Sequence, residues 1–387
     1  MRDLIPTFAP EYGYEERSAI MSHIAHDILI TSNYHVKRFE RRFGNMFKRR
    51  AIMVNSGSSA LYIAVKAMGW KPRTRVATCA LAFPTTVAAI VNNGHIPVFV
   101  DCDVTYNADP FQLKAVAEKG VGAAVLAHMV GNTLNPVVFS MFRDTVEDAC
   151  DAIGSSFGNT PAGQFGSISC FSTYMAHHMG TGEGGVVCTK NNDLYDKMLS
   201  YVNWGRSCLC RPGEDNVCGK RMEYEVDGVP YDHKYIAWTL GGNFKPMELS
   251  GVLGNIQINK LPLFKEIRNR NFSYLLSYFA DLTDYVSLPM VVEGADPCWF
   301  AFPLTLRKGD RADICKRIEA RGVQTRLMYT GNILRHPAMD DVEHEAPYPL
   351  DNCNNVMENT FMVGLGQTVS PAECEKVAQV VKEEVVR

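Results

Sequence analysis

Short apolar runs alternate with amphipathic stretches over the first two-thirds of the chain. The apolar runs are rich in Val, Ile, Ala and Cys and show little polar alternation, which is typical of strands buried on both faces of a parallel sheet. Strands are predicted at residues 75–80, 96–101, 123–127, 145–148, 168–171 and 186–189, and helices at 58–68 and 85–92. This order predicts an α/β layer fold with a mostly parallel sheet.

The pattern changes near residue 261. A long amphipathic helix is predicted to begin there, followed by a strand at 299–306 and a helix at 314–321. We therefore expect a large domain over residues 1–260 and a smaller C-terminal α/β domain over 261–387, with the N-terminal segment 1–35 packed on the small domain. Residues 208–235 are dense in glycine, proline and charge, and they predict a long surface loop of the kind that carries function or disorder.

Composition narrows the classes of protein to consider. The chain has 387 residues, of which 46% are apolar, and a formal net charge of −3. It is long enough to bury a large core, and its interspersed charges leave no basic face, which disfavours nucleic acids and anionic membranes as partners. No apolar run approaches the roughly 18–20 residues that span a bilayer, and the N-terminus lacks the pattern of a secretory signal. We expect a cytoplasmic protein whose twelve cysteines are reduced thiols or metal ligands.

Two local patterns suit a ligand that carries a phosphate. Ser-Gly-Ser-Ser at 56–59 precedes a predicted helix, so backbone N–H groups and hydroxyls at the positive helix end can meet a phosphate. The same residues also form an ordinary N-cap, and both interpretations stay open. Asp148 ends an apolar strand, where ligands gather in open α/β sheets and where a carboxylate can keep a pyridine nitrogen protonated. A solvated acidic turn is the alternative for this carboxylate.

Residues 171–185, FSTYMAHHMGTGEGG, carry the most specific signal. They resemble the coenzyme-anchoring motif of the DegT/DnrJ/EryC1 sugar aminotransferases, and the resemblance covers nearly the whole chain. It implies the type I fold of pyridoxal phosphate-dependent transferases, which is aspartate aminotransferase-like with a mostly parallel seven-stranded sheet. His177 stands where the family has its covalently binding lysine, and His178 aligns with the next residue. Because an imidazole forms no Schiff base but moves protons near neutral pH, the resemblance implies that His177 is a base.

The resemblance also implies a set of coenzyme-binding residues. Three positions match residues that bind the phosphate, one aromatic side chain matches the residue that stacks on the ring, and one carboxylate matches the partner of the pyridine nitrogen. A second carboxylate lies where a polar residue approaches the ring hydroxyl, and an asparagine matches the one that reaches the phosphate from the neighbouring subunit. In this order the residues are Gly57, Ser58 and Ser172, then Phe83, Asp148, Asp151 and Asn243. A shared site of this kind implies a homodimer.

The exchange of lysine for histidine resembles the sugar 3-dehydratase branch of the family. Four cysteines with the spacing C-x57-C-x-C-x7-C resemble the [2Fe-2S] ligands of the 3-dehydrase that acts on CDP-4-keto-6-deoxyglucose. A four-thiolate zinc site has a similar ligand demand and stays an alternative. The eight other cysteines are expected to be mostly buried, small hydrophobic residues. The four matching cysteines are Cys150, Cys208, Cys210 and Cys218.

The resemblance implies removal of the C3 hydroxyl from a nucleotide-linked 4-keto-6-deoxyhexose with pyridoxamine phosphate, in deoxysugar biosynthesis for surface polysaccharides such as lipopolysaccharide O-antigen. Electrons would come from a ferredoxin-type flavin reductase through the cluster. One alternative is a redox-neutral dehydratase, like the enzyme for GDP-4-keto-6-deoxymannose, with glutamate as amine donor. Another is a non-catalytic family member. Tyr329, Thr330 and Asn332 lie in a stretch that both dehydratases share, and they have no assigned role.

Overall fold

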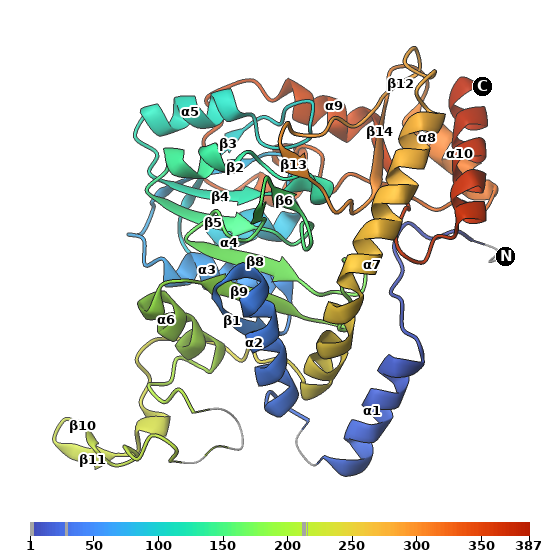
Figure 1. Cartoon of the computed structure of the whole chain (residues 1–387). Helices are drawn as coiled ribbons and strands as arrows, with labels where there is room; N and C mark the ends of the chain where they lie inside the picture. Colours follow the sequence, from blue (N-terminus) through green and yellow to red (C-terminus); the bar gives the residue numbers. More distant parts are fainter. Residues whose placement is uncertain (1–3, 28–29, 211–213, 215) are drawn as a thin grey trace.

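The centre of the molecule is a seven-stranded sheet with strand order β1-β9-β8-β5-β4-β2-β3 (Figure 1). The computed structural model describes residues 4–27, 30–210, 214 and 216–387, so parts of the predicted segments 1–35 and 208–235 lie outside the described residues. β9 runs antiparallel to both of its neighbours, and the other pairings are parallel, which confirms the predicted α/β class. The strands are β1 (Arg50–Val54), β2 (Arg75–Cys79), β3 (Ile96–Val100), β4 (Ala123–Ala127), β5 (Asp144–Asp148), β8 (Ile168–Ser172) and β9 (Gly185–Thr189).

Helices cover both faces of this sheet, which explains why its strands lack polar alternation. On one face, apolar side chains of α3 (Gly57–Ala67), α4 (Pro84–Val91) and α6 (Asn192–Val202) share one core with the strands. On the other face, α2 (Tyr34–Phe47) packs its phenylalanines on β1, β8 and β9, and α5 (Pro110–Glu118) covers β2, β3 and β4. The predicted helices at 58–68 and 85–92 correspond to α3 and α4.

The C-terminal part contains a four-stranded antiparallel sheet with the order β12-β14-β16-β15. Its core is continuous with the core over β2, β3 and β4, so the two sheets are joined by apolar packing. The predicted strand at 299–306 is shorter in the structure because residues 299–301 lie outside the ladder. The elements are β12 (Val286–Ser287), β14 (Phe302–Leu306), α8 (Arg311–Ala320), β15 (Thr325–Leu327), α9 (Asp351–Asn359), β16 (Thr360–Val363) and α10 (Pro371–Val386).

α7 (Glu248–Tyr278) is one continuous helix of 31 residues that begins earlier than predicted and runs through residue 260. α1 (Tyr14–His26) packs along it, because Glu16 accepts a hydrogen bond from Gln257 at 2.8 Å and lies 2.9 Å from the Nζ of Lys260. Ahead of α1, Ile5 forms a parallel bridge with Val323 beside β15. The N-terminal residues therefore contact both α7 and the C-terminal part.

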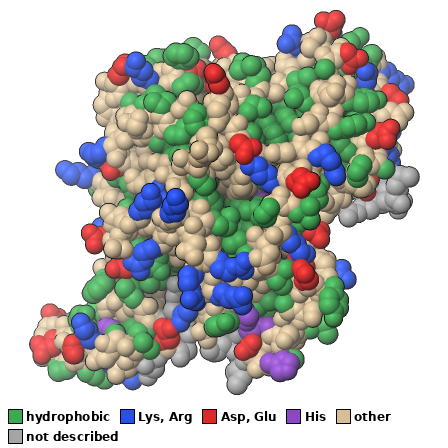
Figure 2. All heavy atoms as spheres, in the orientation of Figure 1, with side chains coloured by type: hydrophobic (Ala, Val, Ile, Leu, Met, Phe, Trp, Pro, Cys, Tyr) green, Lys and Arg blue, Asp and Glu red, His purple; other side chains and the backbone are tan. Residues whose placement is uncertain are grey.

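The remaining elements are short and lie in connections. Residues 208–235 contain a hairpin that extends away from the sheet (Figure 1). No helix in the described part of the chain has the length and apolar content for a bilayer crossing, and acidic and basic side chains are both spread over the face in Figure 2. The short elements are β6 (Ser156–Phe157), β7 (Thr160–Pro161), β10 (Tyr224–Val226), β11 (Val229–Tyr231), β13 (Ala295–Asp296) and the 3-10 turns η1 (Met129–Gly131), η2 (Pro136–Met141), η3 (His233–Tyr235), η4 (Ile333–Arg335) and η5 (Pro337–Met339).

Candidate active site

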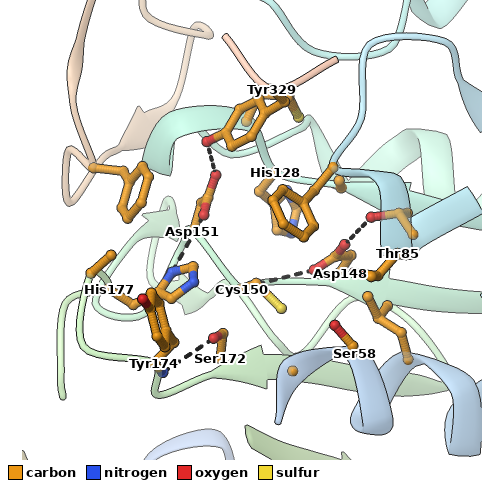
Figure 3. Close-up of a pocket in the computed structure, with 18 of the residues that line it drawn as sticks. Ser58, Thr85, His128, Asp148, Cys150, Asp151, Ser172, Tyr174, His177 and Tyr329 are labelled. Carbon is orange, nitrogen blue, oxygen red and sulfur yellow. Dashed lines mark hydrogen bonds and ion pairs between the residues drawn. The ribbon is translucent and has the colours of Figure 1, made fainter. Parts of the chain in front are cut away.

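A cavity of about 570 Å³ lies between the central sheet and the C-terminal part (Figure 3). Its size falls in the range of small-molecule and cofactor sites. The start of α3 and the ends of β5 and β8 form one wall, and Phe300, Arg326 and Tyr329 contribute from the C-terminal part. The cavity brings together His177 with six of the seven predicted coenzyme-binding residues, namely Gly57, Ser58, Phe83, Asp148, Asp151 and Ser172.

The first turn of α3 faces the cavity with free hydrogen-bond donors. Ser56 is the N-cap, and its Oγ accepts the backbone N–H of Ser59 at 3.1 Å. The other N–H groups of a first turn have no partner within the helix and favour an anion. A Cβ on Gly57 would lie 2.9 Å from the Cβ of Ser172 and 3.3 Å from the Sγ of Cys150. Only glycine therefore lets the start of α3 pack directly against the end of β8.

Asp148 is held in place at the end of β5. Its Oδ2 accepts a hydrogen bond from the Thr86 hydroxyl at 2.7 Å, and its Oδ1 accepts the backbone N–H of Cys150 at 3.2 Å. The residue is 5% exposed and lines the cavity. Phe83, by contrast, is 53% exposed and leaves a ring free to stack on a ligand. The wall therefore offers an oriented carboxylate and an open aromatic ring.

His128 lines the cavity beside these residues, and its hydrogen bonds determine which ring nitrogen carries the proton. Its Nδ1 accepts the backbone N–H of Leu134 at 3.0 Å, so its Nε2 carries the proton that it donates to the Glu147 carboxylate at 2.9 Å. Burial raises the pKa of Glu147, but the bond from His128 and backbone N–H groups outweigh it, so the pKa is lowered. His128 is therefore a rigid wall residue whose two nitrogens are already bonded.

His177, the candidate base, also lines the cavity. Its ring stacks on Phe300 with a centroid distance of 5.1 Å, and its Nδ1 lies 3.4 Å from the Oδ1 of Asp151. Burial, together with the positive charge of Arg268, lowers the pKa of His177 to about 4. The imidazole is therefore neutral at neutral pH and has a lone pair with which to accept a proton.

The structure separates the two adjacent histidines. The Nε2 of His178 contacts the carbonyl of Cys298 at 2.8 Å, and the ring is fully buried outside the cavity lining. His177 is part of the lining. Of the pair, His177 thus meets the requirement of facing a ligand, whereas His178 fastens the chain to the segment before Phe300.

The sequence did not predict that Tyr329 bonds to Asp151. The Tyr329 hydroxyl donates a hydrogen bond to the Oδ2 of Asp151, although 178 residues separate the two. Burial and the nearby Asp148 raise the pKa of Asp151 to about 7. Tyr329 also has φ of 50°, an unfavourable backbone conformation for a residue with a large side chain. Its position in the stretch 327–337, which resembles one shared by both dehydratases, was its signal in the sequence.

Arg268 is a second missed residue, and it acts behind the cavity wall. It lies in α7, is 2% exposed, and its Nη1 donates to the carbonyls of Trp299 and Phe300 at 2.9 and 3.0 Å. These bonds position Phe300 against His177, and the charge disfavours protonation of the imidazole. Nothing in the sequence distinguishes Arg268 from the other charged residues of this amphipathic helix, so its contact with the Phe300 segment could not be predicted.

No three of the four predicted cluster cysteines have thiols within 4.8 Å of one another in the structure. Cys150 lines the cavity, whereas the Sγ of Cys218 lies 3.4 Å from the Nε2 of His233 in the long loop. Two groups of three metal-ligating side chains lie close together among the described residues, and neither contains Cys150, Cys208, Cys210 or Cys218.

Asn243, the seventh predicted coenzyme-binding residue, does not line the cavity. Its backbone carbonyl accepts a hydrogen bond from the side-chain amide of Asn55 at 3.5 Å.

Comparisons with known proteins show the family and the fold of the chain. The model of the DegT/DnrJ/EryC1/StrS aminotransferase family matches residues 11–382. A Salmonella typhimurium relative named lipopolysaccharide biosynthesis protein RfbH is 36% identical over 84% of this chain and 79% of its own. The dTDP-4-dehydro-2,6-dideoxy-D-glucose 3-dehydratase of Saccharopolyspora spinosa is 35% identical over 96% of this chain and 85% of its own. The E. coli GDP-4-keto-6-deoxy-D-mannose-3-dehydratase structure with bound hydrated PLP has a TM-score of 0.87 at 25% identity, covering 97% of this chain and 99% of that one.

Proposed function

The chain belongs to the DegT/DnrJ/EryC1/StrS aminotransferase family, and from this premise we propose that it is a coenzyme-dependent nucleotide-sugar 3-dehydratase. Its substrate would be a nucleotide-linked 4-keto-6-deoxyhexose that loses the C3 hydroxyl. The observation that carries the proposal is a neutral, cavity-facing imidazole at His177, where the family has a lysine. Two relatives, the 3-dehydratases described above, are named for reactions of this class.

The residues present fit pyridoxamine phosphate or pyridoxal phosphate. The close packing of Gly57 on Ser172 leaves the first turn of α3, with Ser58, open toward a phosphate. Asp148, already oriented by Thr86, would pair with the pyridine nitrogen, and Phe83 would stack on the ring. When bound, the coenzyme supplies an electron sink for the breaking of the sugar's C3–O bond.

His177 and Asp151 would handle the proton. A carboxylate accepts hydrogen bonds only, so an ionised Asp151 favours the imidazole tautomer with its proton on Nδ1, 3.4 Å away. The Nε2 lone pair of His177 would then be free to take a proton from the bound reactants. Phe300 limits rotation of the ring, and Tyr329 holds the other carboxylate oxygen of Asp151. General bases placed in this way contribute about 10²- to 10⁴-fold to a rate.

The reductive branch is the finer part of the proposal. It adds a [2Fe-2S] cluster on Cys150, Cys208, Cys210 and Cys218 and a ferredoxin-type flavin reductase as electron donor. No three of these four thiols lie within 4.8 Å of one another in the structure, and the cluster has no part in the steps described above. The support for this branch is the cysteine spacing itself. The redox-neutral, glutamate-dependent dehydratase remains the second candidate, and the intact cavity disfavours a non-catalytic protein.

Iron analysis separates the two branches. Protein purified without oxygen would be assayed for iron and acid-labile sulfide, together with the Cys208→Ser variant. About two irons and two sulfides per chain, lost in the variant, are expected for the reductive branch. Dehydration that proceeds with glutamate and without iron would assign the redox-neutral branch.

Activity on defined substrates tests the parent proposal. The purified chain, loaded with pyridoxamine phosphate, would be mixed with CDP-, GDP- and dTDP-linked 4-keto-6-deoxyhexoses, once with a flavin reductase and NADH as electron source and once with glutamate as amine donor. Products would be identified by mass spectrometry. Loss of the C3 hydroxyl from at least one of them is expected. Transfer of an amino group to the sugar, with the C3 hydroxyl retained, would contradict the proposal.

A further inference from the structure

Three cysteines and an aspartate from distant parts of the chain lie near one another at the carboxyl ends of β2 and β3. None of the four lines the cavity. Cys79 ends β2, Asp101 and Cys102 follow β3 directly, and Cys353 lies in the first turn of α9. All four are buried, with exposures of 6%, 4%, 0% and 0% in that order. The Sγ atoms of Cys102 and Cys353 and a carboxylate oxygen of Asp101 lie within 4.8 Å of one another. The Cys79 thiol interacts with the Cys353 thiol, although it does not lie within 4.8 Å of all three of these atoms.

We propose that this group is a structural zinc site, in which the thiolates of Cys79, Cys102 and Cys353 and the carboxylate of Asp101 bind one ion. Zinc prefers four ligands in a tetrahedron, and structural sites are closed and rich in cysteine. Asp101 accepts backbone N–H groups in the first turn of α9, which explains its burial. That role does not require the thiols of Cys102 and Cys353 within 4.8 Å of the carboxylate. The ligands come from two strand ends and one helix, so the pattern is invisible along the sequence.

Backbone groups already orient these ligands. The Oδ1 of Asp101 accepts the N–H groups of Cys102 and Cys353 at 2.9 and 2.8 Å, and its Oδ2 accepts the N–H of Asn352 at 2.9 Å. The backbone groups of Leu81 and Cys102 also favour the charged forms of the Cys79 and Cys353 thiols, respectively, and so lower their pKa. Hydrogen bonds of this kind hold metal ligands and offset the negative charge of several thiolates. The Oδ2 of Asp101 keeps a lone pair for an ion.

The ion would connect the two sheets. β2 and β3 belong to the central sheet, whereas α9 precedes β16 of the C-terminal sheet. The segment after Cys79 leads to the cavity, because the carbonyl of Ala82 accepts the Thr330 hydroxyl at 2.8 Å next to Phe83 and Tyr329. The site is closed to solvent, so the ion would enter as the chain folds and would add to the free energy of unfolding.

Metal analysis of the full-length protein tests the proposal. The protein would be produced with zinc in the medium, dialysed against EDTA and analysed for zinc. About one zinc per chain that resists the chelator is expected. X-ray absorption at the zinc edge should show about three sulfur ligands near 2.3 Å and one oxygen. Absence of retained zinc, or a disulfide among the three cysteines in the intact mass, would overturn the proposal.

Matched variants locate the ion. Cys353→Ser and Cys102→Ala should lower the zinc content of the folded protein at least tenfold. Cys374→Ser changes another buried cysteine, which contacts the carbonyl of Asn271 at 3.8 Å, and should leave zinc unchanged. Cys208→Ser should also retain zinc, and loss there would assign the ion to the long loop and refute the site. If the first two variants fail to fold, cobalt in the wild-type protein should still show thiolate-to-metal absorption, and its absence would refute the site equally.

Discussion

The side chains around His177 form one connected group. The imidazole lies between the Phe300 ring and the Asp151 carboxyl, and Tyr329 closes the group at the other carboxylate oxygen. Burial keeps His177 neutral and makes Asp151 ionise near neutral pH, since it raises the pKa of that carboxyl to about 7. The ionised fraction of Asp151, and with it the favoured tautomer of His177, therefore changes within the physiological pH range.

Removal of the Tyr329 hydroxyl should shift the pH dependence of catalysis. The bond from Tyr329 lowers the pKa of Asp151 against the effect of burial, so Tyr329→Phe should raise that pKa. If the ionised carboxylate is the active form, the acid limb of the kcat profile moves to higher pH, and kcat at pH 7 falls by about tenfold. Steady-state rates between pH 5.5 and 9 measure both effects.

Tyr106→Phe is the matched control for this variant. It removes another buried tyrosine hydroxyl, which contacts the Oγ1 of Thr305 at 2.9 Å outside the cavity lining. It should lower the melting temperature without moving the pH profile. A Tyr329→Phe profile that superimposes on that of the wild type would show that Tyr329 does not tune Asp151.

The residues that could be predicted from the sequence are those that follow strands or begin helices along the chain. Asp148 was marked by its place at a strand end, and Gly57 and Ser58 by the start of a helix, whereas Ser172 was implied by the family resemblance. Phe300 and Tyr329 come from the C-terminal part, and hydrophobic periodicity carries no information on which distant segments pack together. The proximity of Cys79, Cys102 and Cys353 could not be predicted for the same reason, since the three lie in separate segments of the sequence.

Among the elements, α3 is the one whose position decides coenzyme binding. Gly57→Ala would place a methyl group 2.9 Å from the Cβ of Ser172 and 3.3 Å from its Cα, and both atoms are fixed to the backbone of β8. The start of α3 must then shift away from β8, and its N–H groups no longer converge on a phosphate. We expect the Kd for pyridoxamine phosphate to rise by at least about tenfold, as measured by fluorescence titration.

Gly122→Ala provides the control, because a Cβ at Gly122 meets nothing within 4 Å. Its coenzyme affinity should equal that of the wild type. An equal affinity in Gly57→Ala as well would mean that the first turn of α3 does not bind the phosphate.

The strands and helices themselves were easier to predict than their ends. Continuous apolar runs gave six strands of the central sheet, but β1 was missed, although four of its five residues are buried. Its apolar stretch, AIMV, follows a basic run and has no alternation to mark it. α7 begins at Glu248 and not near residue 261, because its first turns are buried against α2 and therefore show no polar face. Amphipathic periodicity marks only the part of a helix that faces solvent on one side.

For the whole molecule, we expect Asn243 to complete the site of a neighbouring subunit. The residue lies outside the cavity of its own chain, and the family resemblance implies that it reaches the neighbouring subunit's phosphate. We expect that equal mixing and reassembly of two inactive variants, His177→Asn and Asn243→Ala, restores roughly a quarter of wild-type activity, because half of the dimers then contain one intact shared site. No recovery in reassembled dimers would place Asn243 and His177 of one chain in the same site.

The most direct test of the account is the His177→Asn variant assayed on two properties at once. The phosphate and ring contacts of Gly57, Ser58 and Asp148 are untouched, so the affinity for pyridoxamine phosphate should equal that of the wild type. Removal of the imidazole should lower the rate of C3 dehydration of the nucleotide-linked 4-keto sugar by at least about 100-fold. Dehydration at the wild-type rate with coenzyme fully bound would contradict the assignment of His177 as the base.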